Sequence, residues 1–345
     1  MTAPTHEDTP LAAAGANRPQ TPEVSVVIPS CRRPELLRRC LAALARQTLA
    51  PECFEVLVVD DGRDNATRAV AVEFARTHPR VAWRYLRPGA GTRGPAAARN
   101  GGWRAAAAPL IAFTDDDTVP ADDWLAEGLR TMAANRLWDA ASGCIVVPHE
   151  RPPTDHARNT AGLAAAEFVT ANAFVRVGAL ARVGGFDERF TRAWREDSDL
   201  QFSILESGGR IGRAARARVA HPVRPAPWGV SIAQQRNVAF DALLYRKHPA
   251  FYRQRIRRRP PWLYAAIVAA TAIAVIALLA AAWIVAAIAA AGALAGIAVF
   301  AAHRLRGASH APAHVAEMLV TSGAIPFVAL WWRAVGAWRY RTLFP

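Results

Sequence analysis

Lysine and cysteine are both scarce in this sequence. Of its 345 residues 42 are basic, yet only one of these, Lys247, is a lysine, so the positive charge comes almost wholly from arginine. Cysteine occurs four times, without the paired spacing of a zinc site or the framework of a small secreted domain, at Cys31, Cys40, Cys53 and Cys144. We therefore expect reduced cysteines that fill small spaces in a core.

Two glycine-rich phosphate-binding motifs are absent. A dinucleotide-binding turn requires G-x-G-x-x-G directly after the first strand. Here the first apolar run, Val24–Ile28, is stopped by Pro29, and the turn Ser30–Pro34 that follows contains no glycine. The P-loop pattern G-x-x-x-x-G-K-[ST] occurs nowhere in the chain. If the protein binds a nucleotide, its phosphates must be held by something else, and a metal ion on carboxylates is the obvious candidate.

A signal-peptide pattern is also absent. Residues 1–22 are rich in Ala, Pro and Thr, carry acidic residues and contain no apolar core. Such a composition cannot bury enough apolar surface to fold alone. We expect this stretch to be a disordered lead-in, so that the folded part begins at about residue 23.

The sequence does contain a regular alternation of strand and helix patterns. Buried strands are predicted from short apolar runs at Val24–Ile28, Phe54–Val59, Val81–Leu86, Pro109–Phe113 and Gly143–Val147. Helices are predicted between them at Pro34–Leu44, Asn65–Thr77, Pro95–Ala108 and Ala121–Asn135. This order predicts an α/β fold with a doubly wound, mostly parallel sheet within residues 23–250.

Three consecutive carboxylates, Asp115, Asp116 and Asp117, follow the strand Pro109–Phe113 almost directly. The carboxyl ends of parallel strands form the rim of the ligand crevice in open α/β sheets. Adjacent carboxylates repel one another, and oxygen ligands at this density suit Mg²⁺ or Mn²⁺. A metal site is therefore predicted here, although a solvated turn after a strand is the plain alternative.

Other polar residues stand at comparable positions. Asp61 ends the strand Phe54–Val59 at the same predicted sheet edge. Glu196 and Asp197 open a helix, where acidic residues also serve simply to complement the helix dipole. His221 follows a strand-like segment and is either close to the metal or a buried structural histidine.

The last third of the chain has the composition of membrane helices. Residues 262–302 contain no charged side chain, and one helix of that length would span ~60 Å, about twice a bilayer core. Two helices that break near Ala280–Trp283 fit better. Positive charge lies at both ends, in Arg255, Arg257, Arg258 and Arg259 before the run and in His303, Arg304 and Arg306 after it. This pattern predicts a hairpin with both ends in the cytoplasm.

The segments around the hairpin complete the predicted organisation. The basic linker 251–261 lies beside the apolar run, which favours membrane lipids over nucleic acid as the partner of the positive charge. Residues 303–345 are expected to form an interfacial helix followed by a third membrane span. The polar, Pro-rich stretch Pro148–Gly162 is expected to be a mobile loop on the acceptor side.

Six short motifs occur in the order and spacing of a known family. They are Val24-Ser-Val-Val-Ile-Pro-Ser30, Val58-Val-Asp-Asp-Gly62, Ala98-Arg-Asn100, Phe113-Thr-Asp-Asp-Asp117, Gly184-Gly-Phe-Asp187 and Arg195-Glu-Asp-Ser-Asp-Leu200. In these motifs, over about Val24 to His221, the chain closely resembles the family 2 glycosyltransferases, whose catalytic domain has the GT-A fold. The apolar segment resembles that of bacterial members that work on cytoplasmic-side acceptors.

The resemblance implies a role for each matching residue. Pro29 and Ser30 would lie along the donor nucleoside, Asp61 would accept a hydrogen bond from its base, and Arg99 and Asn100 would line the donor pocket. Asp115 and Asp117 match the metal-holding D-x-D positions, with Asp116 beside them against the donor and His221 as a further candidate ligand. Asp197 matches the general base, with Glu196 beside it.

The resemblance also implies the reaction. It is inverting transfer of a sugar from a nucleotide-sugar, most often a UDP-sugar, with Mg²⁺ or Mn²⁺. The membrane hairpin favours a lipid-linked or other membrane-surface acceptor, as in cell-envelope polysaccharide or glycolipid synthesis, with a simple anchor and a soluble acceptor as the alternative. The enzyme would be a multi-pass protein of the cytoplasmic membrane, with its catalytic domain in the cytoplasm. A nucleotidyltransferase-like enzyme and a non-catalytic membrane module of the same fold remain alternatives.

Overall fold

The computed structural model describes residues 7–10, 21–89, 91–149 and 152–345. The chain divides into two compact units. The sheet unit comprises Met1–Pro148 and Leu163–Pro222, and the helical unit comprises His149–Gly162 and Val223–Pro345. The helical unit therefore includes a piece of chain that lies, in sequence, between two parts of the sheet unit.

The described residues of the sheet unit form one nine-stranded sheet in the order β1-β4-β3-β2-β5-β8-β7-β9-β6. Its strands are β1 (Glu7–Pro10), β2 (Val24–Ser30), β3 (Phe54–Asp60), β4 (Ala82–Arg87), β5 (Leu110–Thr114), β6 (Val119–Pro120), β7 (Ala140–Val146), β8 (Asn172–Arg176) and β9 (Ile211–Ala220). The pairings make β4, β3, β2, β5, β7 and β9 run in one direction and β1, β8 and β6 in the other. The predicted mostly parallel sheet is confirmed.

One face of the sheet is covered by three helices, α1 (Pro34–Leu44), α2 (Asn65–Thr77) and α4 (Trp124–Ala134). Apolar residues recur every three or four positions on α1, so this helix has one buried side. Leu41, Phe74 and Trp124 from the three helices join Val26 of β2 in one buried apolar cluster.

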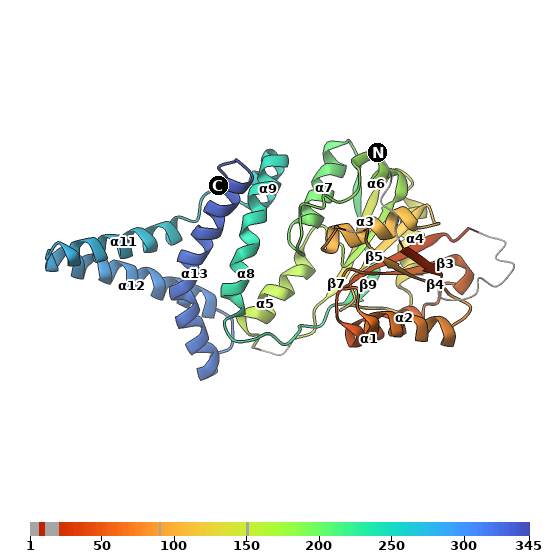
Figure 1. Ribbon diagram of the computed structural model, residues 1–345, viewed down its shortest axis with the longest axis horizontal. Helices are drawn as coiled ribbons and strands as arrows, with labels where there is room; N and C mark the ends of the chain where they lie inside the picture. Colours follow the sequence, from red (N-terminus) through yellow and green to blue (C-terminus); the bar gives the residue numbers. More distant parts are fainter. Residues whose placement is uncertain (1–6, 11–20, 90, 150–151) are drawn as a thin grey trace. The chain divides into compact units, whose positions relative to one another are not determined.

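The other face is covered by α3 (Pro95–Ala105), α6 (Val177–Val183) and α7 (Glu196–Glu206). Ala98, Leu180 and Leu200 from these helices form a second buried cluster with Val27 of β2. Successive residues of a strand point to opposite faces, which is why Val26 and Val27 belong to different clusters. Figure 1 shows α1 and α2 on the side of the sheet opposite to α3, the arrangement of a doubly wound fold.

Two sequence expectations for the sheet need correction. Strand β2 was expected to stop at Pro29 but continues to Ser30, pairing with β3 along its whole length. A proline is tolerated there because β5 pairs with β2 only as far as Val27, so one side of Pro29 has no ladder bond to lose. Within the predicted disordered lead-in, Glu7–Pro10 forms β1, antiparallel to β4; residues 1–6 and 11–20 lie outside the described residues.

The helical unit consists of α5 (Asp155–Ala161), α8 (Val230–Gln234), α9 (Ala239–Lys247), α10 (Pro249–Phe251), α11 (Trp262–Leu279), α12 (Trp283–Leu305) and α13 (Pro312–Arg339). Short 3-10 turns lie at Pro51–Cys53, Gly162–Ala165 and Gln235–Val238, and a π turn lies at Tyr252–Ile256. Helices α8 and α9 belong to this unit, whereas the sequence assigned residues 223–250 to the catalytic domain.

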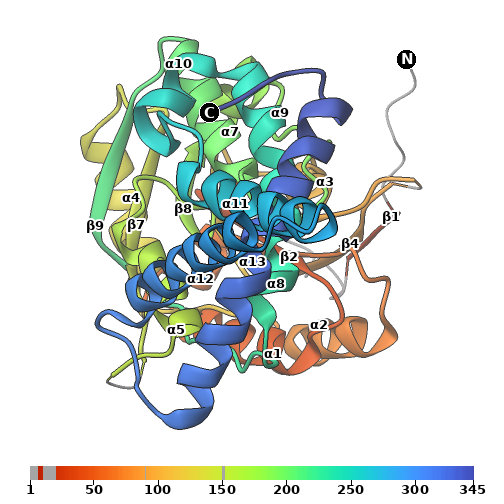
Figure 2. The same ribbon diagram turned by 90° about the vertical axis from the view of Figure 1, so that its left-hand side faces the viewer.

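Three helices, α11, α12 and α13, are long and apolar enough to cross a membrane. Only 11% of the most apolar window of α11 and 17% of that of α12 is buried inside the protein, so both helices present apolar surface outward. They run side by side as a hairpin (Figure 1, Figure 2), and the predicted break near Ala280–Trp283 is confirmed. The predicted pair of an interfacial helix and a third span is instead one continuous helix, α13.

The stretch expected to be a mobile loop, Pro148–Gly162, contains helix α5. Thr154 begins this helix by accepting a hydrogen bond from the backbone N–H of Ala157 at 3.1 Å. Asp155 in its first turn has the charge that the positive end of a helix favours. The helix is also bonded to α12 and α13, as described below; residues 150 and 151 lie outside the described residues.

Candidate functional site

Polar side chains gather where strands of the same direction end. Ser30 is the last residue of β2, Asp61 follows β3, Asp115 follows β5 and His221 follows β9. Because β2, β3, β5 and β9 run the same way, these residues lie at one edge of the sheet, where α/β folds bind ligands.

Three of the predicted metal ligands come together at this edge. Asp115, Asp117 and His221 each offer a ligand atom, and these atoms all lie within 4.8 Å of one another. His221 Nε2 and Asp117 Oδ1 lie 3.5 Å apart. His221 is fixed by its backbone N–H, which donates to the carbonyl oxygen of Val146 in β7 at 2.8 Å.

The donor set fits a divalent cation. Two carboxylates and an imidazole are ligands that Mg²⁺ and Mn²⁺ accept, with the carboxylate oxygens preferred. His221 Nδ1 is buried and has no hydrogen-bond partner among the described residues. Buried polar atoms are normally satisfied, so the unpartnered Nδ1 shows that the protein does not use the full hydrogen-bonding capacity of this ring, whose other nitrogen lies 3.5 Å from Asp117 Oδ1.

Asp116 is not a member of this cluster. Its carboxylate accepts hydrogen bonds from Ser30 Oγ at 2.9 Å and from Arg33 Nη1 at 3.2 Å. Burial raises the pKa of Asp116 to about 6; Arg33 opposes this rise and the neighbouring Asp117 adds to it. Among the three consecutive aspartates, the outer two therefore face His221, whereas the middle one ties the cluster to the turn after β2.

Arg99 of α3 lies between the metal cluster and the start of α7. Its guanidinium donates to Asp115 Oδ1 at 2.7 Å and to Glu196 Oε1 at 3.1 Å, and the side chain is only 3% exposed. The sequence placed Arg99 in the donor pocket; the structure gives it two carboxylate partners that are themselves candidate site residues. It holds together an acidic group on β5 and one on α7.

Glu196 and Asp197 stand at an unusual helix start. The residue before them, Arg195, is not a glycine and yet has φ 75°, a conformation that is costly for a bulky side chain. Burial raises the pKa of Glu196 to about 7, with the neighbouring Asp197 adding to the rise and Arg99 opposing it. Glu196 Oε2 is buried without a partner in the part of the chain that the structure describes.

Asp197 is partly buried and accepts a hydrogen bond from the backbone N–H of Ser198 at 2.8 Å. Burial is also the main cause that raises the pKa of Asp197. The bond to Ser198 satisfies one of the backbone N–H groups that the first turn of α7 leaves open, so Asp197 also stabilises the start of the helix. A raised pKa makes each carboxylate a better proton acceptor than an ordinary one.

Asp60 and Asp61 are adjacent but have different roles in the structure. Asp60 is fully buried, and its oxygens accept hydrogen bonds from Gly62 N at 2.9 Å, Asp64 N at 2.7 Å and Tyr85 Oη at 2.6 Å. Asp61 Oδ2 accepts from Gly94 N at 2.9 Å, whereas its Oδ1 is buried and, among the described residues, has no partner. Asp61 therefore keeps a carboxylate oxygen available for a ligand.

Asn100 does not join the other predicted site residues. Its side-chain nitrogen donates to the carbonyl oxygen of Phe186 and to Glu188, both at 2.8 Å, and its oxygen accepts from Phe186 N and Trp103 Nε1, both at 2.9 Å. Gly185 has φ 78°, and a Cβ there would lie 2.5 Å from Asn100 Oδ1. Asn100 thus secures the turn that contains the Gly-Gly-Phe-Asp motif.

Sequence reasoning missed the role of Arg33. This residue pairs with Asp116 at 3.2 Å and lies 3.9 Å from Asp117, so it contributes positive charge beside the carboxylates. Its position in the turn directly after β2 was the available signal, but the partner is 83 residues away in sequence.

Two family models match the chain over the region just described. The model for glycosyl transferase family 2 matches residues 25–190, and the model for glycosyl transferase family group 2 matches residues 110–303. The second match covers more than half of the 345 residues and extends through α11 and most of α12.

Individual relatives agree with the family models. Validoxylamine A glucosyltransferase of Streptomyces hygroscopicus subsp. limoneus is 31% identical over 274 residues, which is 66% of this chain and 57% of that protein. The chain thus spans less than two thirds of that relative's length. Glycosyltransferase AglE of Haloferax volcanii is 27% identical over 218 residues, covering 59% of this chain and 68% of AglE.

A solved structure shares the fold. Mannosyltransferase PcManGT from Pyrobaculum calidifontis, determined in complex with GDP-Man and Mn²⁺, superposes with a TM-score of 0.56 at 20% identity. The likeness covers 93% of this chain and 88% of the mannosyltransferase.

Proposed function

Because the chain belongs to the family 2 glycosyltransferases, we propose that it moves a sugar from a nucleotide-diphosphate sugar to an acceptor hydroxyl, with inversion at the anomeric carbon. The observation that carries this proposal is that the acidic residues after β5 lie close to the acidic start of α7. Asp115 and Asp117 lie beside His221, and Arg99 connects Asp115 to Glu196 at the start of α7. A metal site and a candidate base are what inverting transfer requires.

Asp115, Asp117 and His221 are the residues that would hold Mg²⁺ or Mn²⁺. When bound, the ion supplies a Lewis acid that neutralises the leaving diphosphate. Arg33 adds positive charge on the same side, since it lies 3.9 Å from Asp117. Asp116 and Ser30 bond to each other, which fixes the turn along which the nucleoside would lie.

Proton removal from the acceptor hydroxyl is assigned to Asp197, with Glu196 beside it. A base needs a pKa close to the working pH, and burial raises the pKa of both carboxyl groups. Arg99 limits the rise at Glu196, because its positive charge favours the ionised form of that carboxyl group.

Asp61 is the proposed partner of the donor base, because its Oδ1 is buried and lacks a partner among the described residues. Asp61→Ala is expected to weaken nucleotide binding by about 1–3 kcal/mol, the usual cost of leaving a buried polar group unpaired. Calorimetry with UDP and with GDP measures this. Unchanged affinity for both nucleotides would show that Asp61 only fixes Gly94.

The nucleotide itself is best identified by experiment. A UDP-sugar is the proposed donor, and GDP-sugars must be tested beside it because a mannosyltransferase of similar fold was solved with GDP-Man. The test is slow hydrolysis of each nucleotide-sugar by the full-length protein in Mn²⁺, without acceptor. Release of free sugar and nucleoside diphosphate supports transfer from that donor. Release of sugar phosphate would indicate attack on the diphosphate instead, and no turnover of any donor would count against the proposal.

For the membrane region, we propose that α11 and α12 span the cytoplasmic membrane as a hairpin. Their apolar surfaces are largely exposed, and arginines flank the pair on both sides. Nucleotide-sugars are cytoplasmic, so the sheet unit would face the cytoplasm. An enzyme so close to lipid suits a lipid-linked or other membrane-surface acceptor, as in cell-envelope polysaccharide or glycolipid synthesis.

Labelling tests this topology. In a variant without native cysteines, Arg253→Cys and His310→Cys are expected to react with an impermeant maleimide only from the cytoplasmic side. Ala281→Cys, in the connection between α11 and α12, is the matched control and is expected to react only from the opposite side. Reaction of the first two from outside would overturn the proposed orientation.

A further inference from the structure

The segment that carries α5 begins and ends at the candidate metal site. It leaves the sheet after Val146, whose carbonyl oxygen accepts the backbone N–H of His221 at 2.8 Å. It returns through Ala171, whose carbonyl oxygen accepts Thr114 Oγ1 at 3.0 Å, and Thr114 directly precedes Asp115. The segment is therefore bonded at one end to His221 and at the other to the residue that precedes Asp115.

A second segment leaves the sheet unit from the same place. Strand β9 ends at Ala220, His221 follows it, and the chain enters the helical unit after Pro222 and reaches α8. Each crossing from the sheet unit into the helical unit therefore lies within a few residues of His221 or of its partner Val146.

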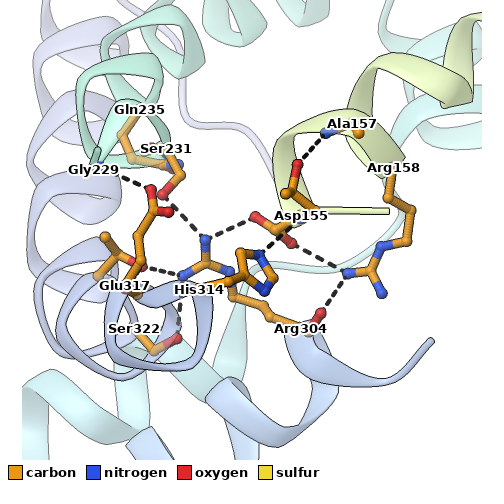
Figure 3. A network of polar contacts seen from close by, with 12 residues as sticks. Asp155, Ala157, Arg158, Gly229, Ser231, Gln235, Arg304, His314, Glu317 and Ser322 are labelled. Carbon is orange, nitrogen blue, oxygen red and sulfur yellow. Dashed lines mark hydrogen bonds and ion pairs between the residues drawn. The ribbon is translucent and has the colours of Figure 1, made fainter. Parts of the chain in front are cut away.

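One arginine holds both segments inside the helical unit (Figure 3). Arg304 of α12 donates through Nη2 to Asp155 Oδ2 of α5 at 2.8 Å and to Ser231 Oγ of α8 at 3.1 Å. Its Nη1 donates to Thr321 Oγ1 at 2.6 Å and to Ser322 Oγ at 3.2 Å, both on α13. Four helices are thus connected through a single guanidinium that is 6% exposed.

Neighbouring bonds fix the same two segments. His314 Nε2 of α13 accepts the backbone N–H of Asp155 at 3.0 Å, and Glu317 accepts the backbone N–H of Gly229 at 2.8 Å, just before α8. Arg158 of α5 donates to the carbonyl oxygen of Arg304 at 2.9 Å. The bonds run from α12 and α13 to both α5 and the start of α8.

Simple stabilisation or membrane orientation does not explain this arrangement well. A buried ion pair adds little net stability relative to apolar residues of similar size, because both charges must lose their water. Orientation requires positive charge near the lipid headgroups, and exposed His303 and Arg306 already supply it. What the network does is bond α5 and the start of α8 to α12 and α13.

We propose that Arg304 is a positioning residue for glycosyl transfer. Through Asp155 and Ser231 it holds the two segments that begin beside Val146 and His221, so that the geometry of the candidate metal site depends on α12 and α13. This inference rests on the proposed function, because it concerns the efficiency of that reaction.

The experiment compares full-length wild type with Arg304→Ala in lipid nanodiscs, with Arg306→Gln, an exposed arginine two positions away, as the matched control. Hydrogen exchange in Arg304→Ala is expected to rise in α5 and also at residues 163–171 in the sheet unit. Mn²⁺ affinity, measured by electron paramagnetic resonance, is expected to fall about 10-fold, as is usual when the groups that orient metal ligands are lost. The control is expected to match wild type in both measurements.

A second variant distinguishes loss of the Arg304–Asp155 ion pair from general misfolding. Arg304→Met combined with Asp155→Leu replaces the ion pair by apolar residues, a change that buried pairs commonly tolerate. It is expected to keep the melting temperature while showing the same loss of Mn²⁺ affinity. The inference would be overturned if hydrogen exchange became faster in α5 alone. In that outcome both variants would keep wild-type exchange at residues 163–171 and wild-type Mn²⁺ affinity. If wild type itself binds no Mn²⁺, the metal assignment fails, and exchange at residues 163–171 still decides the role of Arg304.

Discussion

Asp117→Asn is expected to lower metal-dependent sugar transfer by on the order of 10³-fold or more. A bound divalent ion supplies several kcal/mol of stabilisation to the leaving diphosphate, and each 1.36 kcal/mol changes the rate tenfold. The substitution keeps the size of the side chain but removes a negative charge 3.5 Å from His221. The measurements are initial transfer rates over a Mn²⁺ titration and Mn²⁺ binding by electron paramagnetic resonance.

Asp116→Asn is the matched control, because it removes the same charge from the adjacent residue. Asp116 bonds to Ser30 and Arg33 and lies outside the Asp115–Asp117–His221 cluster, so its variant is expected to keep Mn²⁺ affinity. Full turnover in excess EDTA, together with an unaffected Asp117→Asn enzyme, would refute the metal assignment. Equal loss of Mn²⁺ binding in both variants would mean that the whole acidic turn, and not two of its residues, holds the ion.

Asp197→Asn is expected to lower kcat by ~10²–10⁴-fold while donor affinity and melting temperature stay close to those of wild type. The reason is that asparagine keeps an oxygen to accept from Ser198 N but cannot take a proton from the acceptor. Glu196→Gln is the comparison variant. It leaves the Asp197 carboxylate in place and changes only the Glu196 carboxylate, which pairs with Arg99.

The pH dependence of kcat gives a second measurement for the same prediction. A base works only in its ionised form, and burial raises the pKa of Asp197 and raises that of Glu196 to about 7. Activity should therefore fall, as the pH is lowered, at a higher pH than it would for a base with the ordinary pKa of a carboxylate. If Asp197 only caps α7, its variant would instead lose about 1 kcal/mol of stability and keep its turnover.

Local patterns in the sequence were sufficient for the five strands β2, β3, β4, β5 and β7 and for the acidic residues that follow β3 and β5. Leu110–Thr114 is a buried strand because it is apolar throughout, and the direction of the parallel strands places Asp61 and Asp115 at one edge. Each of these inferences depends on a few neighbouring residues and on the general geometry of α/β sheets.

Distant partners were beyond the reach of such patterns. Arg99 and Asn100 are adjacent, both are buried, and both match one motif, yet Arg99 joins the acidic cluster while Asn100 secures the turn at Gly185. The partner of Arg99 on α7 is 97 residues away. Tertiary packing decides which side of a buried helix faces which neighbour. Local sequence patterns do not predict these long-range contacts.

Helix α5 shows the same limit. Its composition, polar and rich in proline, indicated a mobile loop, although Thr154 and Asp155 form a good helix start. What holds the helix is Arg304, 149 residues further along the chain. No local feature of residues 148–162 could reveal that partner.

That separation also fixes an order of events during synthesis. Asp155 leaves the ribosome 149 residues before Arg304, and the pairing of β7 with β9 can already form in the meantime. Chains grow from the N-terminus at about 5–20 residues per second, so α5 lacks its partners for several seconds or more. The contacts of α5 with α12 and α13 can form only after the apolar helices have been made. A newly made chain therefore completes the bonds of Figure 3 late, once α12 and the first part of α13 have been made.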